Sequence, residues 1–245
     1  MLKLITVNIE TNKHYARIIP FITKEQPDVL CLQEIPESFL EGLHNLGYYT
    51  TYAPRVPVAL GENQDSLGIV FASKVPHQSK CVYYYGDEAR ARENFGTEAE
   101  DMSFAYIIAD VATEHGNYTI ATTHLADTKD GREDDFQIML MDNLLKQLAV
   151  EAPHCICGDF NMPRGYNNLY EKVITSYTDT VPAHYASSLD KNIHRLGNVT
   201  IDEPIFEKYL VDYIFSQAPY QVSDVQLHFD VSDHAAISSY LTKTA

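Results

Sequence analysis

The chain has 245 residues, of which 18 are basic and 34 acidic, so its formal net charge is −16. Its 45% hydrophobic and 21% charged residues are ordinary for a globular protein and exclude a collagen, a coiled coil or a wholly disordered chain. Because binding to extended duplex DNA depends on many basic side chains and this charge repels polyanions, such binding is disfavoured.

Strands and helices alternate along the first fifty residues. Residues 2–7 are apolar and β-branched, which predicts a strand, and residues 28–33 predict a second, buried strand. Between them, apolar residues at helical spacing predict a helix that Pro20 would kink or delay. A short helix over residues 37–46 is expected to end at Gly47.

The rest of the chain continues with many short strands and one clear helix. That helix is predicted over residues 134–149, where apolar residues follow one face and two aspartates stand at the positive end. Strands are predicted at residues 48–52, 67–72, 80–85, 103–112, 118–123, 155–158, 210–215, 221–228 and 235–241. No repeat or long linker divides the sequence, so we expect one domain over residues 1–245, of the α/β (α+β) class.

Two stretches carry no regular pattern. Residues 86–101 are polar and predict a mobile surface loop, and residues 178–207 are irregular. Long loops on a compact scaffold often contact substrate, and the alternative is that both are solvated connections. For the acidic residues 98–101, we expect the solvated connection.

The sequence also bears on the cellular compartment. No run of 18 apolar residues is present, so no membrane insertion is expected. Residues 1–8 resemble a strand rather than a signal peptide. Cys31, Cys155 and Cys157 lie in apolar strand-like runs, which is typical of reduced core cysteines. We therefore expect a cytoplasmic protein, with its oligomeric state left open.

Polar residues recur where predicted strands end. They are Asn8, Glu10, Glu34, His124, Asp159, Asn161, Asp212, Asp233 and His234. Each alone is typical of a solvated cap or a hydrogen-bonded structural residue. Together they supply carboxylates that suit Mg²⁺ or Mn²⁺, an Asp–Asn pair able to orient a water, and two histidines able to stabilise a phosphoryl group.

The motifs resemble those of a known family. LQE, THL, GDFN, DYIF and SDH occur here in the order found in the endonuclease/exonuclease/phosphatase superfamily, which has the DNase I-like fold. The resemblance extends from residue 4 to about residue 237. It implies a four-layer αββα sandwich of two mixed, mainly antiparallel β-sheets flanked by helices, with strand-end loops gathered at one rim.

The resemblance implies metal ligands. Glu34 corresponds to the principal ligand and Asp233 to a second residue beside the metal. Asn8 resembles the Asn that contacts the phosphate and the surroundings of the metal. Glu10 stands where some members have an Asp, so its role near the metal is a weaker inference. The expected cofactor is Mg²⁺ or Mn²⁺, and the number of ions stays open.

The resemblance also implies catalytic roles. His124 corresponds to a His that contacts the scissile phosphate or acts as an acid. Asp159 corresponds to the residue that orients or deprotonates the attacking water, and Asn161 to one that holds a phosphate oxygen. His234 corresponds to the phosphate-stabilising His, with Asp212 as its carboxylate partner.

These observations predict a divalent-metal-dependent phosphoesterase. We expect in-line attack of an Asp-oriented water on a phosphodiester or phosphomonoester substrate that is small or single-stranded. One alternative is a DNA-directed nuclease, either a repair endonuclease or an exonuclease; the other is a non-enzymatic scaffold on the same fold. Candidate substrate contacts are Asn192, His194 and Arg195, and after them Arg90 and Arg92, the alternative being ordinary surface turns.

Overall fold

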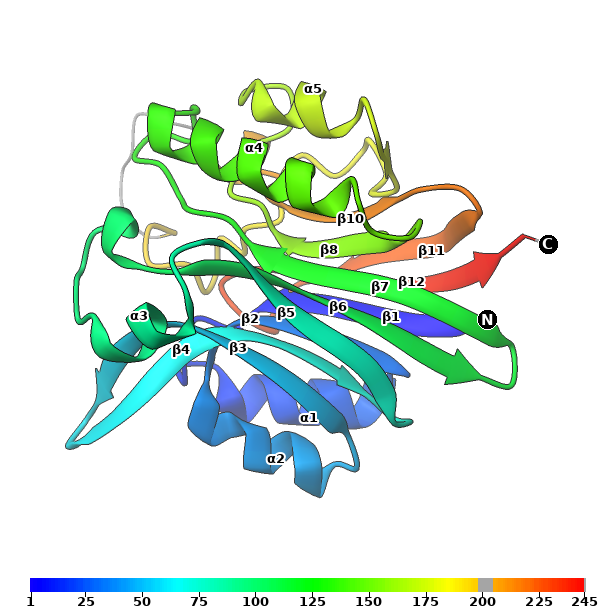
Figure 1. Cartoon of the computed structure of the whole chain (residues 1–245), viewed down its shortest axis with the longest axis horizontal. Helices are drawn as coiled ribbons and strands as arrows, with labels where there is room; N and C mark the ends of the chain where they lie inside the picture. The colour runs from blue at the N-terminus through cyan, green and yellow to red at the C-terminus, as the bar shows by residue number, and fades with distance from the viewer. Residues whose placement is uncertain (198–204, 245) are drawn as a thin grey trace.

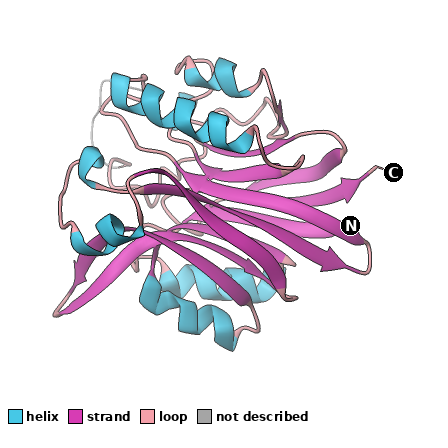
Figure 2. Cartoon of the chain, viewed as in Figure 1, coloured by secondary structure: helices cyan, strands magenta, loops and turns pink. Residues whose placement is uncertain are grey.

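Two six-stranded sheets pack face to face in the computed structural model, which describes residues 1–197 and 205–244. Helices α1 (Tyr15–Glu25) and α2 (Leu40–Asn45) cover the outer face of one sheet. Helices α4 (Asp135–Leu148) and α5 (Leu169–Val173) lie beyond the other sheet (Figure 1). Figure 2 shows the helices confined to the outside. The predicted four-layer αββα sandwich is confirmed.

The first sheet has the strand order β11-β12-β1-β2-β4-β3, in which only β1 and β2 are parallel. Its strands are β1 (Leu2–Asn8), β2 (Val29–Pro36), β3 (Tyr49–Leu60), β4 (Asn63–Ser73), β11 (Tyr220–His228) and β12 (Ala236–Lys243). The parallel pair brings the ends of β1 and β2 together at one edge, with Asn8 opposite Gln33.

The second sheet has the order β5-β6-β7-β8-β10-β9, with β7 and β8 as its parallel pair. Its strands are β5 (His77–Tyr85), β6 (Phe104–Thr113), β7 (Gly116–His124), β8 (Cys155–Asp159), β9 (Thr178–Asp179) and β10 (Asp212–Ser216). His124 pairs with Asp159, and Asp159 with Asp212 on the other side. Three predicted site residues therefore lie in one row.

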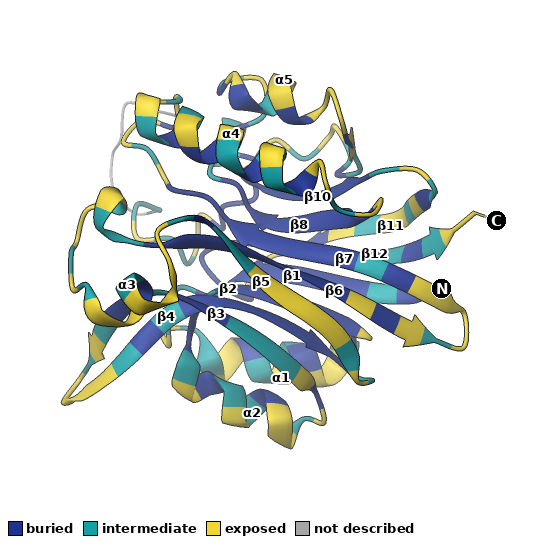
Figure 3. Ribbon diagram, viewed as in Figure 1, coloured by how far each residue is buried: buried dark blue, intermediate teal, exposed yellow. Residues whose placement is uncertain are grey.

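Strand alternation assigns side chains to the two faces of each sheet. On β1, Leu4 belongs to the core between the sheets, whereas Ile5 packs with Ile18 and Ile22 of α1. Burying each of these side chains contributes about 1.5–3 kcal/mol. Thr6 and Asn8 share the face of Leu4, so the end of β1 points toward the second sheet. Figure 3 shows this buried centre.

The predicted mobile loop over residues 86–101 is wrong in part, because it contains α3 (Glu88–Glu93) and the 3-10 turn η2 (Ala99–Asp101). Asp87 caps α3 by accepting a hydrogen bond from the backbone N–H of Arg90 (2.8 Å). Ala91 is the buried residue of this helix. The polar composition therefore hid a capped helix in which one of two alanines is buried.

The β3–β4 hairpin is much longer than the predicted strands at residues 48–52 and 67–72. Pairing continues to the turn, where Leu60 faces Asn63. Pro54 and Pro57 interrupted the sequence pattern, but β3 is an edge strand and tolerates proline. The extension carries Arg55 into the candidate site described below.

The remaining helical segments are short. The 3-10 turn η1 (Glu37–Phe39) leads into α2, and α6 (Ile205–Lys208) follows residues 198–204, which lie outside the described residues. Helix α1 begins at Tyr15 and continues through Pro20, which is exposed, so the delayed start is wrong. None of the described helices is both long and apolar enough to cross a membrane.

Candidate active site

A pocket of about 940 Å³ opens where β1, β2, β7 and β8 end. It is lined by predicted site residues from both sheets: Glu10, Glu34, His124, Asp159, Asn161, Asp233 and His234. Two further predicted residues, Asn8 and Asp212, are buried behind it and hydrogen-bond to residues that line it. The structure therefore brings all nine together.

Asn8 joins the two sheets at the base of the pocket. Its amide nitrogen donates to Glu34 Oε1 (3.1 Å) and to Asp159 Oδ2 (3.0 Å). Its amide oxygen accepts from the backbone N–H of Glu10 (3.1 Å). Since Asn8 is only 2% exposed, these bonds hold the two carboxylates in fixed positions.

Glu34 leaves the regular ladder of β2. The register between β2 and β4 shifts between Gln33 and Ile35, and Glu34 has a φ of 53°. This bulge turns the side chain into the pocket while Gln33 stays buried, where its amide donates to Thr122 Oγ1 (3.2 Å) of the opposite sheet. A left-handed conformation at a non-glycine residue is a strain that recurs at functional sites.

The GDFN motif requires a glycine at its first position because a larger residue would not fit there. Gly158 has a φ of 140°, and a Cβ atom there would lie 2.0 Å from the carbonyl oxygen of Thr123. Only glycine permits β8 to approach β7 this closely. The next residue, Asp159, is thereby placed beside His124.

Asp159 is a buried carboxylate whose surroundings raise its pKa. It is 1% exposed, and burial together with Asp212 raises its pKa to about 8, although His234 acts in the opposite direction. Its Oδ1 accepts from the backbone N–H of Asn161 (2.9 Å). Positive charge near the pocket would favour its ionised form.

His234 and Asp212 form a buried ion pair. His234 Nδ1 lies 2.8 Å from Asp212 Oδ2, which also accepts from Ser188 Oγ (2.6 Å). Burial alone would lower the pKa of His234, but Asp212 and Asp159 raise it well above its usual range. His234 therefore carries a positive charge beside the pocket at neutral pH.

His124 has the opposite character. Burial, Arg55 and His234 hold its pKa well below the usual range, so the ring is neutral. Arg55 Nη1 lies 2.7 Å from its Nδ1, and a guanidinium can only donate. Its Nε2 lies 3.6 Å from Asp159 Oδ2 and 4.0 Å from Glu34 Oε1. Two donors also approach this nitrogen, Arg55 Nη1 and the side-chain amide nitrogen of Asn161, each at 3.3 Å.

The carboxylates of the pocket fit a divalent cation. The Glu34 side chain is 32% exposed, and burial raises its pKa, with Asp233 adding to the effect. Asp212 Oδ1 is buried and has no hydrogen-bond partner among the described residues. This excess of anionic oxygen is the donor set that Mg²⁺ and Mn²⁺ prefer. Glu34 and Asp233 are the predicted ligands and both line the pocket. Among the described residues, the ligand atoms that lie within 4.8 Å of one another are those of two groups: Glu10, His14 and Asp233, and Asp159, Asp212 and His234.

Glu10 lies at the edge of this set. Its carboxylate pairs with Lys13 and with His14 Nε2 (2.9 Å), which together lower its pKa despite burial. Ligand atoms of Glu10, His14 and Asp233 lie within 4.8 Å of one another. Glu10 is therefore near the candidate ligand Asp233, but its charge is already balanced.

The irregular stretch over residues 178–207 borders the pocket in part. His194 and Arg195 line it, whereas Asn192 does not and is exposed. Leu189 forms a bridge with His234, which ties the stretch to the SDH motif. Arg90 and Arg92 do not line the pocket; Arg92 pairs with Glu37 (2.9 Å).

Arg55, Asp127 and Ser188 were not among the predicted site residues. Arg55 lies over the ring of Phe104 (4.4 Å to the centroid), and its buried Nε has no hydrogen-bond partner among the described residues. Asp127 lines the same pocket. Arg55 interrupts an otherwise apolar run of the sequence, a signal that could have been used, whereas nothing local distinguishes Ser188.

Three solved structures have a similar fold. An endonuclease/exonuclease/phosphatase from Beutenbergia cavernae DSM 12333 has a TM-score of 0.69 at 19% identity, over 100% of this chain and 72% of that chain. The human Nocturnin catalytic domain with bound sulfate anion has a TM-score of 0.69 at 20% sequence identity, over 99% of this chain and 93% of that chain. D. rerio TDP2 complexed with single-strand DNA product has a TM-score of 0.66 at 17% sequence identity, over 99% of both chains.

These similarities to solved structures show the fold. A search of curated protein sequences found no match. The sequence model of the Endonuclease/Exonuclease/phosphatase family matches residues 5–234, which is nearly the whole chain. This protein therefore belongs to the endonuclease/exonuclease/phosphatase family.

Proposed function

We propose that this protein is a Mg²⁺- or Mn²⁺-dependent phosphoesterase that hydrolyses its substrate by in-line attack of a water oriented by Asp159. The observation that carries the proposal is the Asn8 amide, which holds Glu34 and Asp159 about 3 Å from one nitrogen. It fixes a candidate metal ligand and a candidate base side by side.

Asp159 is the group that positions the water. One oxygen is fixed by Asn8 and the other by the backbone N–H of Asn161, so the carboxylate cannot rotate. A carboxylate held in this way can orient a water and accept its proton as the new P–O bond forms. A bound divalent cation would neutralise charge on the phosphoryl oxygens.

Positive charge and hydrogen bonds from the chain also face the phosphate. His234 is kept cationic by Asp212, and Arg55, which also lines the pocket, adds a second cation. Neutral His124 and the side-chain amide of Asn161, whose nitrogen lies 3.3 Å from His124 Nε2, add polar groups at the pocket wall. Phosphoryl transfer depends mainly on such placement and charge stabilisation.

The proposed substrate is a small or single-stranded phosphodiester or phosphomonoester. The net charge of −16 disfavours an extended duplex-DNA groove. Two similar structures contain ligands of related chemistry: a sulfate anion in Nocturnin and a single-strand DNA product in TDP2. Both are consistent with a pocket that accepts an oxyanion.

The test is hydrolysis of bis-(p-nitrophenyl) phosphate and a panel of phosphoesters with Mg²⁺ or Mn²⁺. We expect turnover by the wild-type protein and a loss of roughly 100-fold or more in Asp159→Asn. Asp142→Asn is the matched control, because Asp142 is a half-exposed aspartate on α4 that pairs with Lys172. Equal activity in both variants would show that Asp159 does not act on the water.

The same panel separates the alternatives. Preferential cleavage of duplex DNA, with binding that weakens steeply as salt rises, would indicate a DNA-directed nuclease. Absence of hydrolysis together with absence of divalent-dependent stabilisation would indicate a scaffold. The complete set of site residues favours the enzyme over the scaffold.

A further inference from the structure

Asp190 is a buried aspartate of the irregular stretch over residues 178–207, and it does not line the active-site pocket. It contacts two segments that supply residues to the pocket wall. One segment carries Asp233 and His234, and the other carries His194 and Arg195. Since Asp190 is 1% exposed, water does not compete for its hydrogen bonds.

The carboxylate of Asp190 joins these two segments. Its Oδ2 accepts from the backbone N–H of Asp230 (2.6 Å), and its Oδ1 accepts from the backbone N–H of Asn192 (2.9 Å). Asp230 has a φ of 65°, a left-handed conformation that a non-glycine residue keeps only when its surroundings fix it. Arg17 also donates to the Asp230 carbonyl (3.1 Å). Asp190 therefore helps to hold the turn that leads to Asp233.

The backbone of Asp190 makes the same connection. Its N–H donates to the carbonyl of Asp233 (2.7 Å), and its carbonyl accepts from the N–H of His194 (2.8 Å). The preceding residue, Leu189, forms a bridge with His234. One residue thus fixes the backbone of a candidate metal ligand and the backbone of a histidine that lines the same pocket.

We propose that Asp190 is a positioning residue of the active site, which holds Asp233 in place for a bound divalent cation and fixes His194 at the same pocket. This inference rests on the proposed function, because it gives Asp190 a part in metal binding through the backbone of Asp233. Substituting a residue that orients a metal ligand typically weakens metal binding by roughly 10–100-fold.

The test is titration calorimetry with Mn²⁺ alone, in wild type and Asp190→Asn. An amide has nearly the shape of a carboxylate, but it has one acceptor oxygen instead of two, and its NH₂ group would face a backbone N–H. We expect roughly tenfold weaker Mn²⁺ binding in Asp190→Asn. In the hydrolysis of bis-(p-nitrophenyl) phosphate, kcat/KM should fall by a similar factor and recover in part at high Mn²⁺ concentration.

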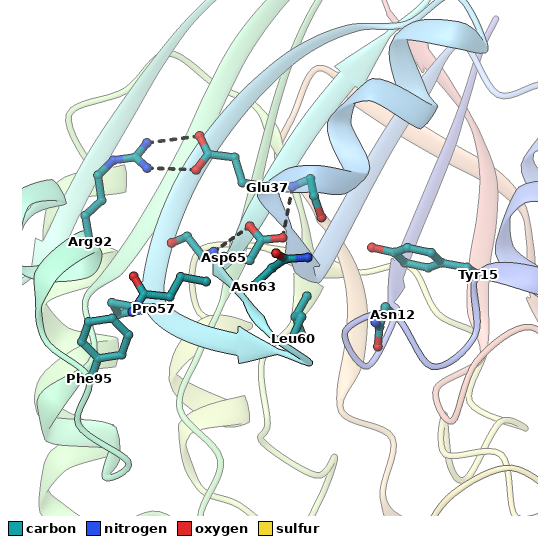
Figure 4. A pocket seen from close by; sticks show the side chains of 12 residues that line it. Asn12, Tyr15, Glu37, Pro57, Leu60, Asn63, Asp65, Arg92 and Phe95 are labelled. Atoms are coloured by element: carbon teal, nitrogen blue, oxygen red, sulfur yellow. Dashed lines mark hydrogen bonds and ion pairs between the residues drawn. The ribbon is translucent and has the colours of Figure 1, made fainter.

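Asp65→Asn is the matched control. Asp65 also joins two segments, since it accepts from the backbone N–H groups of Ser66 (2.7 Å) and Ser38 (3.4 Å) (Figure 4). It lines a different pocket, of about 840 Å³, so Asp65→Asn should bind Mn²⁺ as the wild-type protein does. Equal Mn²⁺ affinity in wild type and Asp190→Asn, or an equal loss in the two variants, would overturn the inference.

A measurement on the wild-type protein keeps the inference testable if Asp190→Asn does not fold. If Asp190 couples the two segments to Asp233, cation binding must stabilise the bonds that Asp190 makes. Saturating Mg²⁺ should therefore slow hydrogen exchange of the Asn192 and Asp230 amides about threefold and leave the Ser66 amide unchanged. Unchanged exchange at Asn192 and Asp230 would contradict the inference.

The outcomes separate this inference from the proposed function. If the wild-type protein binds Mn²⁺ but hydrolyses no phosphoester, and Asp190→Asn binds Mn²⁺ more weakly, the proposed function fails and the role of Asp190 stands. If the wild-type protein binds Mn²⁺ and hydrolyses phosphoesters, but Asp190→Asn has wild-type affinity, only this inference fails. Absence of Mn²⁺ binding in the wild-type protein would contradict both.

Discussion

Arg55 Nη1 lies 2.7 Å from Nδ1 of His124, the buried and neutral one of the two histidines of the site. Arg55 helps to keep His124 neutral, while Asp212 helps to keep His234 cationic. The two histidines thus have different charge states, and can play different roles, because their surroundings differ. Arg55 itself provides the cation on the His124 side.

Arg55→Met should reduce kcat/KM for a phosphoester by roughly 100-fold, because it removes a charged donor from the phosphate site. Arg55→Lys should recover only part of the loss, since an ammonium group cannot both contact His124 and stack on Phe104 as the guanidinium does. Steady-state kinetics of the two variants measure the effect.

Arg132→Met is the control for this pair. Arg132 also lies over an aromatic ring, that of Tyr166 (4.5 Å), but it does not line the active-site pocket. If Arg55→Met and Arg132→Met have the same kcat/KM, Arg55 does not act on the phosphate.

Gly158→Ala should destabilise the fold by more than about 3 kcal/mol, because it combines a disfavoured φ with a Cβ contact to the Thr123 carbonyl. Gly116→Ala separates the two causes. Gly116 also has a positive φ (123°), but no atom lies within 4 Å of its added Cβ, so a loss of about 1 kcal/mol is expected. Urea unfolding measures the free energy of unfolding of both variants. Equal losses would show that the close approach of β7 and β8 is not what requires glycine at position 158.

His154 makes stability depend on pH. It is fully buried; its Nδ1 lies 2.7 Å from the Ala152 carbonyl and its Nε2 lies 2.8 Å from the Tyr177 hydroxyl. Burial lowers its pKa in the folded state below the unfolded value of about 6.5. The unfolded chain therefore binds more protons just below pH 6.5, and stability falls as the pH decreases there.

His154→Asn should flatten this dependence. The variant loses packing at pH 7.5, but the difference in free energy of unfolding from the wild-type protein should shrink toward pH 5.5. The exposed His184 provides a control, since His184→Asn should keep the wild-type slope. A constant difference between wild type and His154→Asn at all pH values would contradict the argument.

The site could be predicted from the sequence where the signal is local. Asn8, Glu34 and Asp159 each follow or end an apolar strand, and strand ends meet at one rim of a sandwich. Arg55 leaves only a weak signal, one charged residue in an apolar run, because two prolines obscure the extension of β3 that places it. Its role depends on Phe104 and His124, which are distant in sequence.

The two irregular stretches show a second limit. Residues 86–101 were expected to be a loop because only Ala91 is buried in α3, too little apolar sequence to reveal a helical period. Ser188 contacts Asp212 through a segment with no regular structure, so no pattern could identify it. The cytoplasmic location and the single domain over residues 1–245 stay predictions.

The central claim is that a divalent cation held by Glu34 is needed for hydrolysis. The most direct measurement is the rate of bis-(p-nitrophenyl) phosphate hydrolysis after chelation and during titration with Mg²⁺ or Mn²⁺, in wild type and Glu34→Gln. We predict loss of activity on chelation, saturable recovery with either cation, and a recovery roughly 100-fold lower in Glu34→Gln. Full activity in the chelated protein, or equal recovery in Glu34→Gln, would contradict the account.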